Sequence, residues 1–176
     1  MNIVIRQEQG SEYPVVNQLV LEAFKDMEFS DGDEHDLVAN LRKSEDFIPE
    51  LSLVALENDR IVGHILFTSS RIISEDSVFE SLTLAPVSVH PDFQRQGIGK
   101  SLILEGLRIA KSLGFRNVNV LGHPDYYPKF GFIPSTAFGI LPPIKVPEEV
   151  FMMLELGDNS LKGIHGTVQY AKEFGI

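Results

Sequence analysis

Apolar and polar residues alternate along the first part of the chain in patterns that predict strands separated by two helices. Residues 3–6 form a short apolar strand, and from residue 15 apolar side chains recur at helical spacing, with Ser11 as the expected N-cap. A second, shorter helix is expected next, with Asp33 as its cap. Two strand-like runs, 51–57 and 60–70, flank Asn58 and Asp59 and therefore predict an antiparallel hairpin.

The pattern continues with a fourth strand, a long helix and a fifth strand. Glu75 and Asp76 form a second expected turn, and the fourth strand runs from there to Val89. Apolar positions from 102 to 113 predict one helix that ends before Gly114. The strand expected at 117–121 should be parallel to the fourth, because a helix-length crossover joins them. Further strands are expected in the tail, at 150–156 and 163–170.

Length and composition predict a single domain, residues 1–176, that buries a core of its own. No stretch approaches the roughly 18 apolar residues of a membrane span, and the first residues become polar too soon for a signal peptide. The chain contains no cysteine, which excludes disulfides and a cysteine acyl-enzyme and fits a cytoplasmic protein. Five histidines are scattered along the chain, so no metal site is expected.

The charge balance bears on the kind of partner that the chain can bind. Fifteen Lys and Arg oppose 25 Asp and Glu, for a formal net charge of −10. Nucleic-acid binding depends on clustered basic residues that neutralise phosphates, so no nucleic-acid partner is expected. No membrane partner is expected either. An acidic surface suits a cationic amine substrate only weakly, and solubility alone accounts for it better. A homodimer stays open.

The loop between the fourth strand and the long helix has the pattern of a phosphate-binding turn. Strand, glycine-bearing loop and helix start is the arrangement in which free backbone N–H groups converge on an anion. A P-loop would need glycine where Gln94 stands, and a dinucleotide fingerprint would need glycine where Leu102 stands. Both of these nucleotide-binding motifs are therefore excluded.

The run Gln94-Arg95-Gln96-Gly97-Ile98-Gly99 instead resembles the Q/R-x-x-G-x-G/A signature of the GNAT acetyltransferases. A second segment, Tyr126-Tyr127-Pro128-Lys129-Phe130-Gly131-Phe132, resembles the motif that follows the fifth strand in that superfamily. The resemblance covers residues 3–132, and the tail resembles that of a bacterial subgroup with an extended C-terminus. It implies an α/β (α+β) GNAT fold, with a mixed, mostly antiparallel sheet splayed between strands 4 and 5 and helices on both faces.

The resemblance also implies acetyl-CoA as the acetyl donor and assigns residues to it. Pro86 within the fourth strand agrees with a bulge or break there, because proline cannot donate to a sheet ladder. The implied contacts to the pantetheine arm come from the backbone of Val87, Ser88 and Val89, and the Val87 N–H is the expected oxyanion donor. The implied contacts to the pyrophosphate come from Gln94, Arg95, Gln96, Gly97, Ile98, Gly99, Lys100 and Ser101.

Tyr127 matches the position of the general acid that protonates the departing thiolate in this family. Tyr126 is its competitor and is expected to pack in the core. The position of the family's fourth-strand glutamate holds Thr83, which cannot act as a base. The candidates for the general base are therefore Glu80, His64, His123 or water.

The resemblance implies an N-acetyltransferase that moves acetyl from acetyl-CoA to a primary amine on a small molecule or peptide. With no cysteine to carry an acyl group, direct attack in a ternary complex is expected. Glu28, Phe29 and Asp31 lie in the linker between the first two helices, where this fold usually meets its acceptor. A non-catalytic CoA-binding sensor is the alternative, because Thr83 replaces the glutamate.

Overall fold

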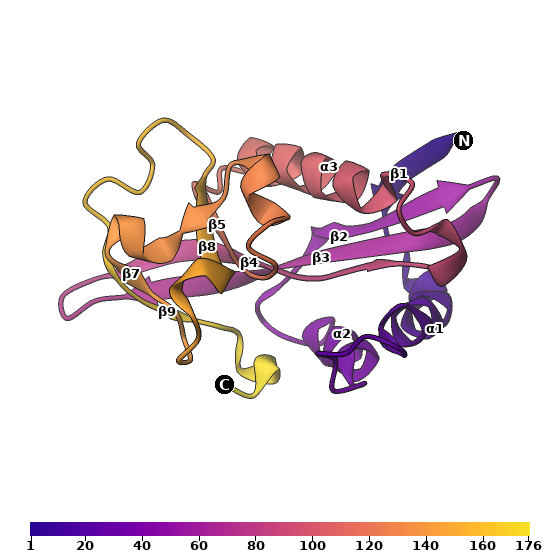
Figure 1. Ribbon diagram of the computed structural model, residues 1–176, viewed down its shortest axis with the longest axis horizontal. Coiled ribbons are helices and arrows are strands. Elements are labelled where there is room, and N and C mark those ends of the chain that lie inside the picture. Colours follow the sequence, from indigo (N-terminus) through magenta and orange to yellow (C-terminus); the bar gives the residue numbers. More distant parts are fainter. The chain divides into compact units, whose positions relative to one another are not determined.

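The computed structural model describes residues 1–176, which form two compact units. The first unit contains residues 1–67 and 85–109, and the second contains residues 68–84 and 110–176. Strands β3 (Arg60–Ile73) and β4 (Val78–Val89) and helix α3 (Ile98–Ser112) contribute residues to both units (Figure 1). None of the helices has the length and apolar character that a membrane crossing requires.

In the first unit the strand order is β1-β2-β3-β4. Strand β1 (Ile3–Gln7) pairs antiparallel with β2 (Phe47–Glu57), which begins earlier than its sequence pattern indicated. The turn between β2 and β3 has Asn58 at φ 48° and Asp59 at φ 64°. Two successive left-handed residues are the signature of a type I′ turn, whose twist matches that of the flanking strands. The predicted hairpin is therefore confirmed.

Helices α1 (Tyr13–Phe24) and α2 (Glu34–Leu41) pack against each other and against strand β2 of the first unit. Their apolar faces bury a valine cluster with strand β2, formed by Val16, Val20, Val38 and Val54. The predicted caps were wrong in detail. Ser11 lies inside a short 3₁₀ turn, Gly10–Glu12, and the Glu12 carboxylate accepts the Gln9 N–H at 2.9 Å while it pairs with Arg6. The chain therefore enters α1 through this acid-capped turn. Asp33 does occupy the N-cap position of α2, but its side chain makes no capping hydrogen bond.

Helix α3 approaches strand β3 unusually closely within the first unit. A Cβ at Gly63 of β3 would lie 3.0 Å from side-chain atoms of Ile98 and Leu102, and a Cβ at Gly106 of α3 would overlap the ring of Phe67. Val54 of β2 faces the valine cluster, and Ser52, two residues earlier in the same strand, points to the same face. The hydrogen bond between Ser52 and His64 places the His64 side chain on that face as well. Gly63, the residue before His64, then faces α3, because successive strand residues point to opposite faces. The sheet of this unit thus carries α3 on one face and α1 with α2 on the other (Figure 1).

The second unit is built around strand β5 (Asn117–Leu121). Along its full length β5 pairs antiparallel with β8 (Phe151–Glu155), and β8 then pairs with the short β6 (Ile133–Pro134). Toward β4 it makes a single parallel pair, Thr83↔Asn119. The predicted parallel relation of the fourth and fifth strands is confirmed by this pair.

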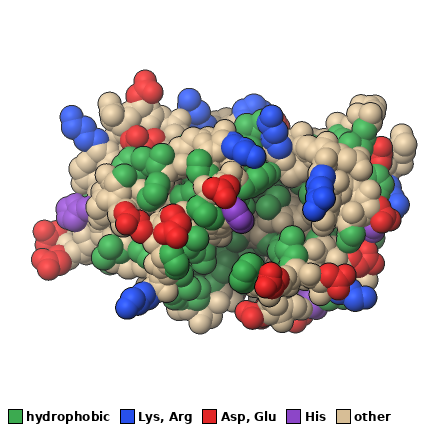
Figure 2. Space-filling view, viewed as in Figure 1, with side chains coloured by type: hydrophobic (Ala, Val, Ile, Leu, Met, Phe, Trp, Pro, Cys, Tyr) green, Lys and Arg blue, Asp and Glu red, His purple; other side chains and the backbone are tan.

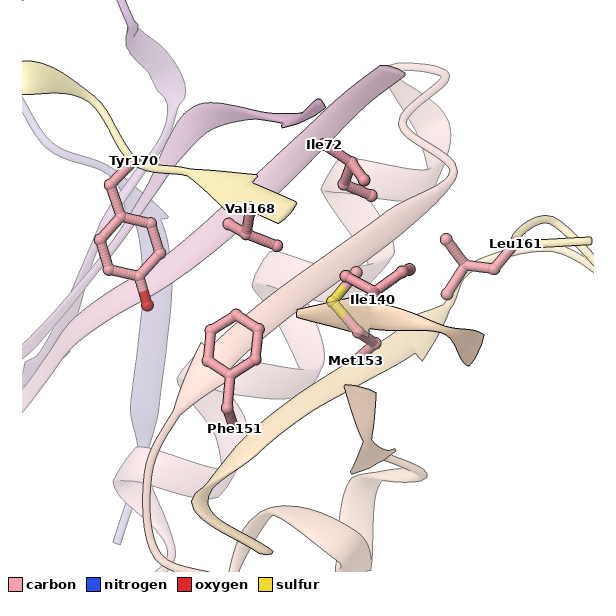
Figure 3. Close-up of a cluster of buried hydrophobic side chains, with 7 residues drawn as sticks. All are labelled: Ile72, Ile140, Phe151, Met153, Leu161, Val168 and Tyr170. Atoms are coloured by element: carbon pink, nitrogen blue, oxygen red, sulfur yellow. The ribbon is translucent and has the colours of Figure 1, made fainter. Parts of the chain in front are cut away.

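The tail contributes a hydrophobic core to the second unit. Strand β9 (Gly166–Gln169) pairs antiparallel with β3 and parallel with β7 (Ile140–Leu141), and β8 and β9 confirm the two strands expected in the tail. Figure 3 shows the side chains that these strands bury together, namely Ile72, Ile140, Phe151, Met153, Leu161, Val168 and Tyr170. The tail therefore completes the sheet of this unit and covers its apolar face.

Candidate functional site

The loop that follows β4 is held at both ends by hydrogen bonds within the first unit. The His90 N–H donates to the Val62 carbonyl at 2.9 Å, which keeps the end of β4 paired with β3. A short 3₁₀ turn, Pro91–Phe93, comes next. The Gln94 side chain then donates from Nε2 to the Val89 carbonyl at 3.1 Å. Gln94, one of the predicted site residues, therefore closes the loop onto β4, and its side-chain Nε2 is already used in this hydrogen bond.

Two left-handed residues shape the loop between Gln94 and α3. Arg95 has φ 61° and Gly97 has φ 85°. The first helical hydrogen bond of α3 runs from the Ser101 N–H to the Gly97 carbonyl at 3.0 Å. The N–H groups of Ile98, Gly99 and Lys100 precede that bond and have no i−4 partner. This exposed turn thus carries the partial positive charge of a helix N-terminus and fits an anion.

The residues of β4 and the loop fit a bound acetyl-CoA. Ser88 is buried, with 2% of its surface exposed, and its hydroxyl has no hydrogen-bond partner. Such a group has a large desolvation penalty unless a ligand or water satisfies it. A Cβ at Gly97 would meet no atom within 4 Å, so the outer side of the loop is open. Ile98 is buried and anchors the first turn of the helix. The structure thus brings Val87–Val89 and 94–101 together in one unit.

Tyr127 lies in the second unit, at the start of the 3₁₀ helix Tyr127–Phe130. Its ring packs so closely on Gly122 that a Cβ there would overlap it, and it makes an edge contact with Phe132 at 5.7 Å between ring centroids. Burial, reinforced by the neighbouring Tyr126, raises the pKa of the Tyr127 phenol to about 12. Tyr127 therefore keeps its proton at neutral pH and is available as a proton donor.

Tyr126 is the more exposed ring of the pair, so the expectation that it would be the core residue was wrong. Its ring stands at 87° to that of Tyr127, with 5.2 Å between centroids, and the Lys129 ammonium lies 5.9 Å from its centroid. The short helix turns Tyr127 inward toward Gly122 because that glycine leaves room for a ring. A pair of adjacent tyrosines carries no sequence signal for which of them takes that position.

The candidate bases occupy very different environments. Glu80 is exposed, and its backbone carbonyl accepts a hydrogen bond from Asn117. His123 is exposed, and its Nδ1 accepts the Asp125 N–H at 3.1 Å as part of a turn. His64 is fully buried, and burial together with the nearby Arg42 charge lowers its pKa to about 3. His64 is therefore a neutral imidazole at physiological pH.

His64 belongs to a buried polar network in the first unit. Arg42 and Glu8 form a two-point ion pair, with Nη2–Oε2 at 2.6 Å and Nε–Oε1 at 3.2 Å, and both side chains are almost fully buried. The Ser52 hydroxyl donates to Glu8 Oε1 at 2.8 Å, so its oxygen must accept from His64 Nε2 at 3.0 Å. This order fixes the tautomer with the proton on Nε2.

The same arginine also connects both helices to the strands. Arg42 directly follows α2, donates to Asn17 of α1 at 2.7 Å, and lies 4.1 Å from the centroid of the Tyr13 ring. Breaking a buried ion pair leaves an uncompensated charge in the interior, which is strongly destabilising. Because Arg42 bonds to both helices and to Glu8, the network holds the helices in place against β2 and β3. Sequence reasoning missed it, because Glu8 and Arg42 are 34 residues apart and follow no motif.

Comparison with known proteins places this arrangement in a family. Residues 16–132 match the family model described as the acetyltransferase (GNAT) family, which covers both the loop and the segment with Tyr127. The chain belongs to the GNAT acetyltransferases. Enzymes of this family are acyl-CoA-dependent and use acetyl-CoA as the acetyl donor. The predicted family, fold class and acetyl donor are thereby confirmed.

Its relatives among the GNAT acetyltransferases include two from Escherichia coli. The uncharacterized N-acetyltransferase YjhQ is 42% identical over 69% of this chain and 67% of its own, and YhbS is 30% identical over 98% of each. The solved structure of E. coli YhbS in complex with CoA has a TM-score of 0.89, with 25% identity over 100% of this chain and 93% of its own. A GNAT acetyltransferase from Brucella melitensis in complex with acetyl-CoA has a TM-score of 0.80, with 31% identity over 98% of each chain.

The buried imidazole predicts a pH dependence of stability for this GNAT protein. Its folded-state pKa of about 3 lies below the ordinary value of 6.5, so between these values only the unfolded chain binds the proton. The contribution of His64 is therefore complete above pH 6.5 and decreases as the pH falls. We expect the free energy of unfolding to drop by about 1 kcal/mol per pH unit between pH 6 and pH 5.

Urea unfolding of the wild type and of His64→Gln, at pH 7, 6 and 5, measures this contribution. Glutamine keeps a donor near the position of Nε2 but does not titrate, so the variant should lose most of the slope below pH 6.5. Equal slopes for the two proteins would mean that His64 is not the group responsible.

Proposed function

We propose that this protein transfers the acetyl group of acetyl-CoA to a primary amine, by direct attack while both substrates are bound. The observation that carries the proposal is the turn at Arg95 and Gly97, which precedes the free N–H groups of α3 and lies within the segment matched by the GNAT family. The E. coli and Brucella relatives solved with CoA and acetyl-CoA give it further support.

We assign the binding roles to two stretches of backbone. The N–H groups at the start of α3 are proposed to hold the pyrophosphate, where the helix dipole favours negative charge. The backbone of Val87–Val89 is proposed to hydrogen-bond the pantetheine amides, as an added strand would. Lys100 is exposed at the same helix end, and its ammonium adds positive charge there. When bound, acetyl-CoA supplies an acetyl group already activated as a thioester.

The reacting groups receive three kinds of help in this proposal. The amine nitrogen forms a bond to the carbonyl carbon as the carbon–sulfur bond breaks, and the sulfur takes the electron pair. The Val87 N–H donates to the carbonyl oxygen as negative charge develops on it. The Tyr127 hydroxyl donates its proton to the departing sulfur, consistent with a phenol that stays protonated. The proton of the amine passes to bulk water, directly or through the exposed Glu80 or His123, because Thr83 offers no carboxylate and His64 is buried and neutral.

The acceptor is proposed to be a cationic amine before it loses its proton. The chain has a net charge of −10, and Lys and Arg side chains are scattered over the face shown in Figure 2 rather than gathered in a patch. In the linker between α1 and α2, Glu28 and Asp31 are exposed beside Phe29, of which 96% is exposed. Carboxylates next to an exposed aromatic ring suit an alkylammonium group.

A substitution at Gly97 tests the proposed pyrophosphate site. Gly97→Trp should lower the affinity for CoA at least tenfold, because the indole would cover the exposed N–H groups and strain the left-handed turn. Isothermal titration calorimetry with CoA gives the affinity. Gly114→Trp is the matched control, since Gly114 has a similar φ of 93° and equally open space but lies beyond the other end of α3. An unchanged affinity in Gly97→Trp would refute the assignment, as would tighter binding of ATP or NAD than of CoA.

Initial-velocity kinetics test direct transfer. A screen of primary amines for CoA release in the presence of acetyl-CoA provides an acceptor, and both substrates are then varied. We expect intersecting lines in double-reciprocal plots, because no residue carries the acetyl group between two half-reactions. Parallel lines, or an acetylated protein trapped by mass spectrometry, would contradict direct transfer.

The paired tyrosines provide a test of the general acid. Tyr127→Phe removes only the hydroxyl, so it should leave CoA affinity unchanged and lower kcat on the order of 10²-fold. Tyr126→Phe should keep kcat within a factor of about two to three, since its ring is the more exposed one. Both variants are measured on the same acceptor, with a rapid-quench check that chemistry limits the rate. A full rate in Tyr127→Phe would place the general acid elsewhere, and a collapse in Tyr126→Phe alone would assign the role to the other ring.

A further inference from the structure

Strands β4 and β5 are joined mainly by side chains. Their backbones form one pair, Thr83↔Asn119, whereas β5 makes five pairs with β8 on its other side. Strand β5 is therefore held firmly by β8, and its attachment to β4 depends on something other than a regular ladder. That attachment is made by two asparagines of β5, Asn117 and Asn119, each of which points its amide at β4.

Each amide bonds in both directions. Asn117 donates to the Glu80 carbonyl at 3.0 Å and accepts the Ser81 hydroxyl at 2.6 Å. Asn119 accepts the Thr83 hydroxyl at 3.0 Å, and its Nδ2 donates to Ser81 Oγ at 2.9 Å and to Ser70 Oγ of β3 at 3.1 Å. We call these five residues, Ser70, Ser81, Thr83, Asn117 and Asn119, the amide ladder.

All five side chains of the amide ladder are at most 1% exposed. In such a dry environment an unpaired amide or hydroxyl is destabilising, so the hydrogen bonds depend on one another. Loss of the Thr83 hydroxyl, for example, leaves Asn119 Oδ1 without that donor. The amide ladder is therefore a cooperative unit that favours one geometry of the two strands.

The amide ladder coincides with the end of the pairing between β4 and β5. A backbone ladder holds neighbouring strands about 4.8 Å apart and tends to continue from residue to residue. The hydrogen bonds of the two asparagines end at the single backbone pair, Thr83↔Asn119. Strand β4 nevertheless continues to Val89. Its backbone groups beyond Thr83 have no partner on β5, and they include the stretch Val87–Val89.

We propose that Asn119 and Thr83 are positioning residues for acetyl-CoA, because the amide ladder fixes the point at which β4 stops pairing and leaves Val87–Val89 free for the pantetheine arm. This inference rests on the proposed role of Val87–Val89. Neither residue touches the ligand in this account. Thr83, at the position of the family's fourth-strand glutamate, instead acts through Asn119.

Two variants of Thr83 separate the hydrogen bond from side-chain volume. Thr83→Val keeps the shape and removes the hydroxyl, so the end of β4 should loosen and the affinity for CoA should fall about tenfold. The KM for acetyl-CoA should rise by a similar factor, with kcat changed less than twofold. Thr83→Ser restores the hydroxyl and should return both values to within about twofold of wild type.

Ser160→Ala is the matched control, since Ser160 is a buried residue of the same unit and the change removes its part-buried hydrogen bond from Oγ to the Arg116 carbonyl at 2.6 Å. It should lower the unfolding temperature yet leave CoA affinity unchanged. A similar loss of affinity in Ser160→Ala and Thr83→Val would overturn the inference, because general destabilisation would then explain both. A wild-type affinity in a folded Thr83→Val would overturn it as well.

If Thr83→Val does not fold, Ser81→Ala answers the same question, because it removes the donor to Asn117 and the acceptor of Asn119 without adding volume. Its CoA affinity should also fall about tenfold, and an unchanged value counts against the inference. The pyrophosphate assignment is tested separately by Gly97→Trp. If Gly97→Trp loses CoA while Thr83→Val and Ser81→Ala keep it, only the role of the amide ladder fails.

Discussion

The close approach of α3 to β3 is the constraint on which the geometry of the loop between Gln94 and Lys100 depends. Two glycines permit it, Gly63 on the strand and Gly106 on the helix, and each faces a large side chain of the other element. With the helix held at this distance and Ile98 buried beneath its first turn, the N–H groups at its start have fixed directions. Donors that are already oriented need not reorganise when an anion binds, which is why a packed helix end binds anions better than a flexible loop does.

Features governed by local rules could be predicted from the sequence. The type I′ turn at Asn58 and Asp59 follows from residues that tolerate positive φ, and the length of α3 follows from its apolar spacing and from Gly114. The loop at 94–99 was recognisable because its function depends on backbone conformation, which fixes glycine at defined positions. In each case a few neighbouring residues contain the necessary information.

Pairings between distant residues could not be predicted in this way. Asn117 and Asn119 are polar residues within a strand, and a strand pattern gives no reason for them until the register places them opposite Ser81 and Thr83. The ion pair of Glu8 with Arg42 likewise depends on how α2 packs on the sheet. The orientation of Tyr127 depends on the space above Gly122. Register, packing angle and free volume arise from the whole fold, and no short segment specifies them.

The hydrogen-bond donors of the loop before α3 are backbone N–H groups. Its residues therefore differ in how strongly a substitution disturbs those donors. Arg95 and Gly97 carry the unusual φ angles, so substitutions there alter the shape of the turn itself. The side chains of Gln96 and Lys100 point into solvent at the same turn, and their replacement leaves the N–H groups where they are. Sequence drift can therefore change the charge and chemistry around the loop while the turn keeps its form, so the N–H groups at the start of α3 stay available to an anion.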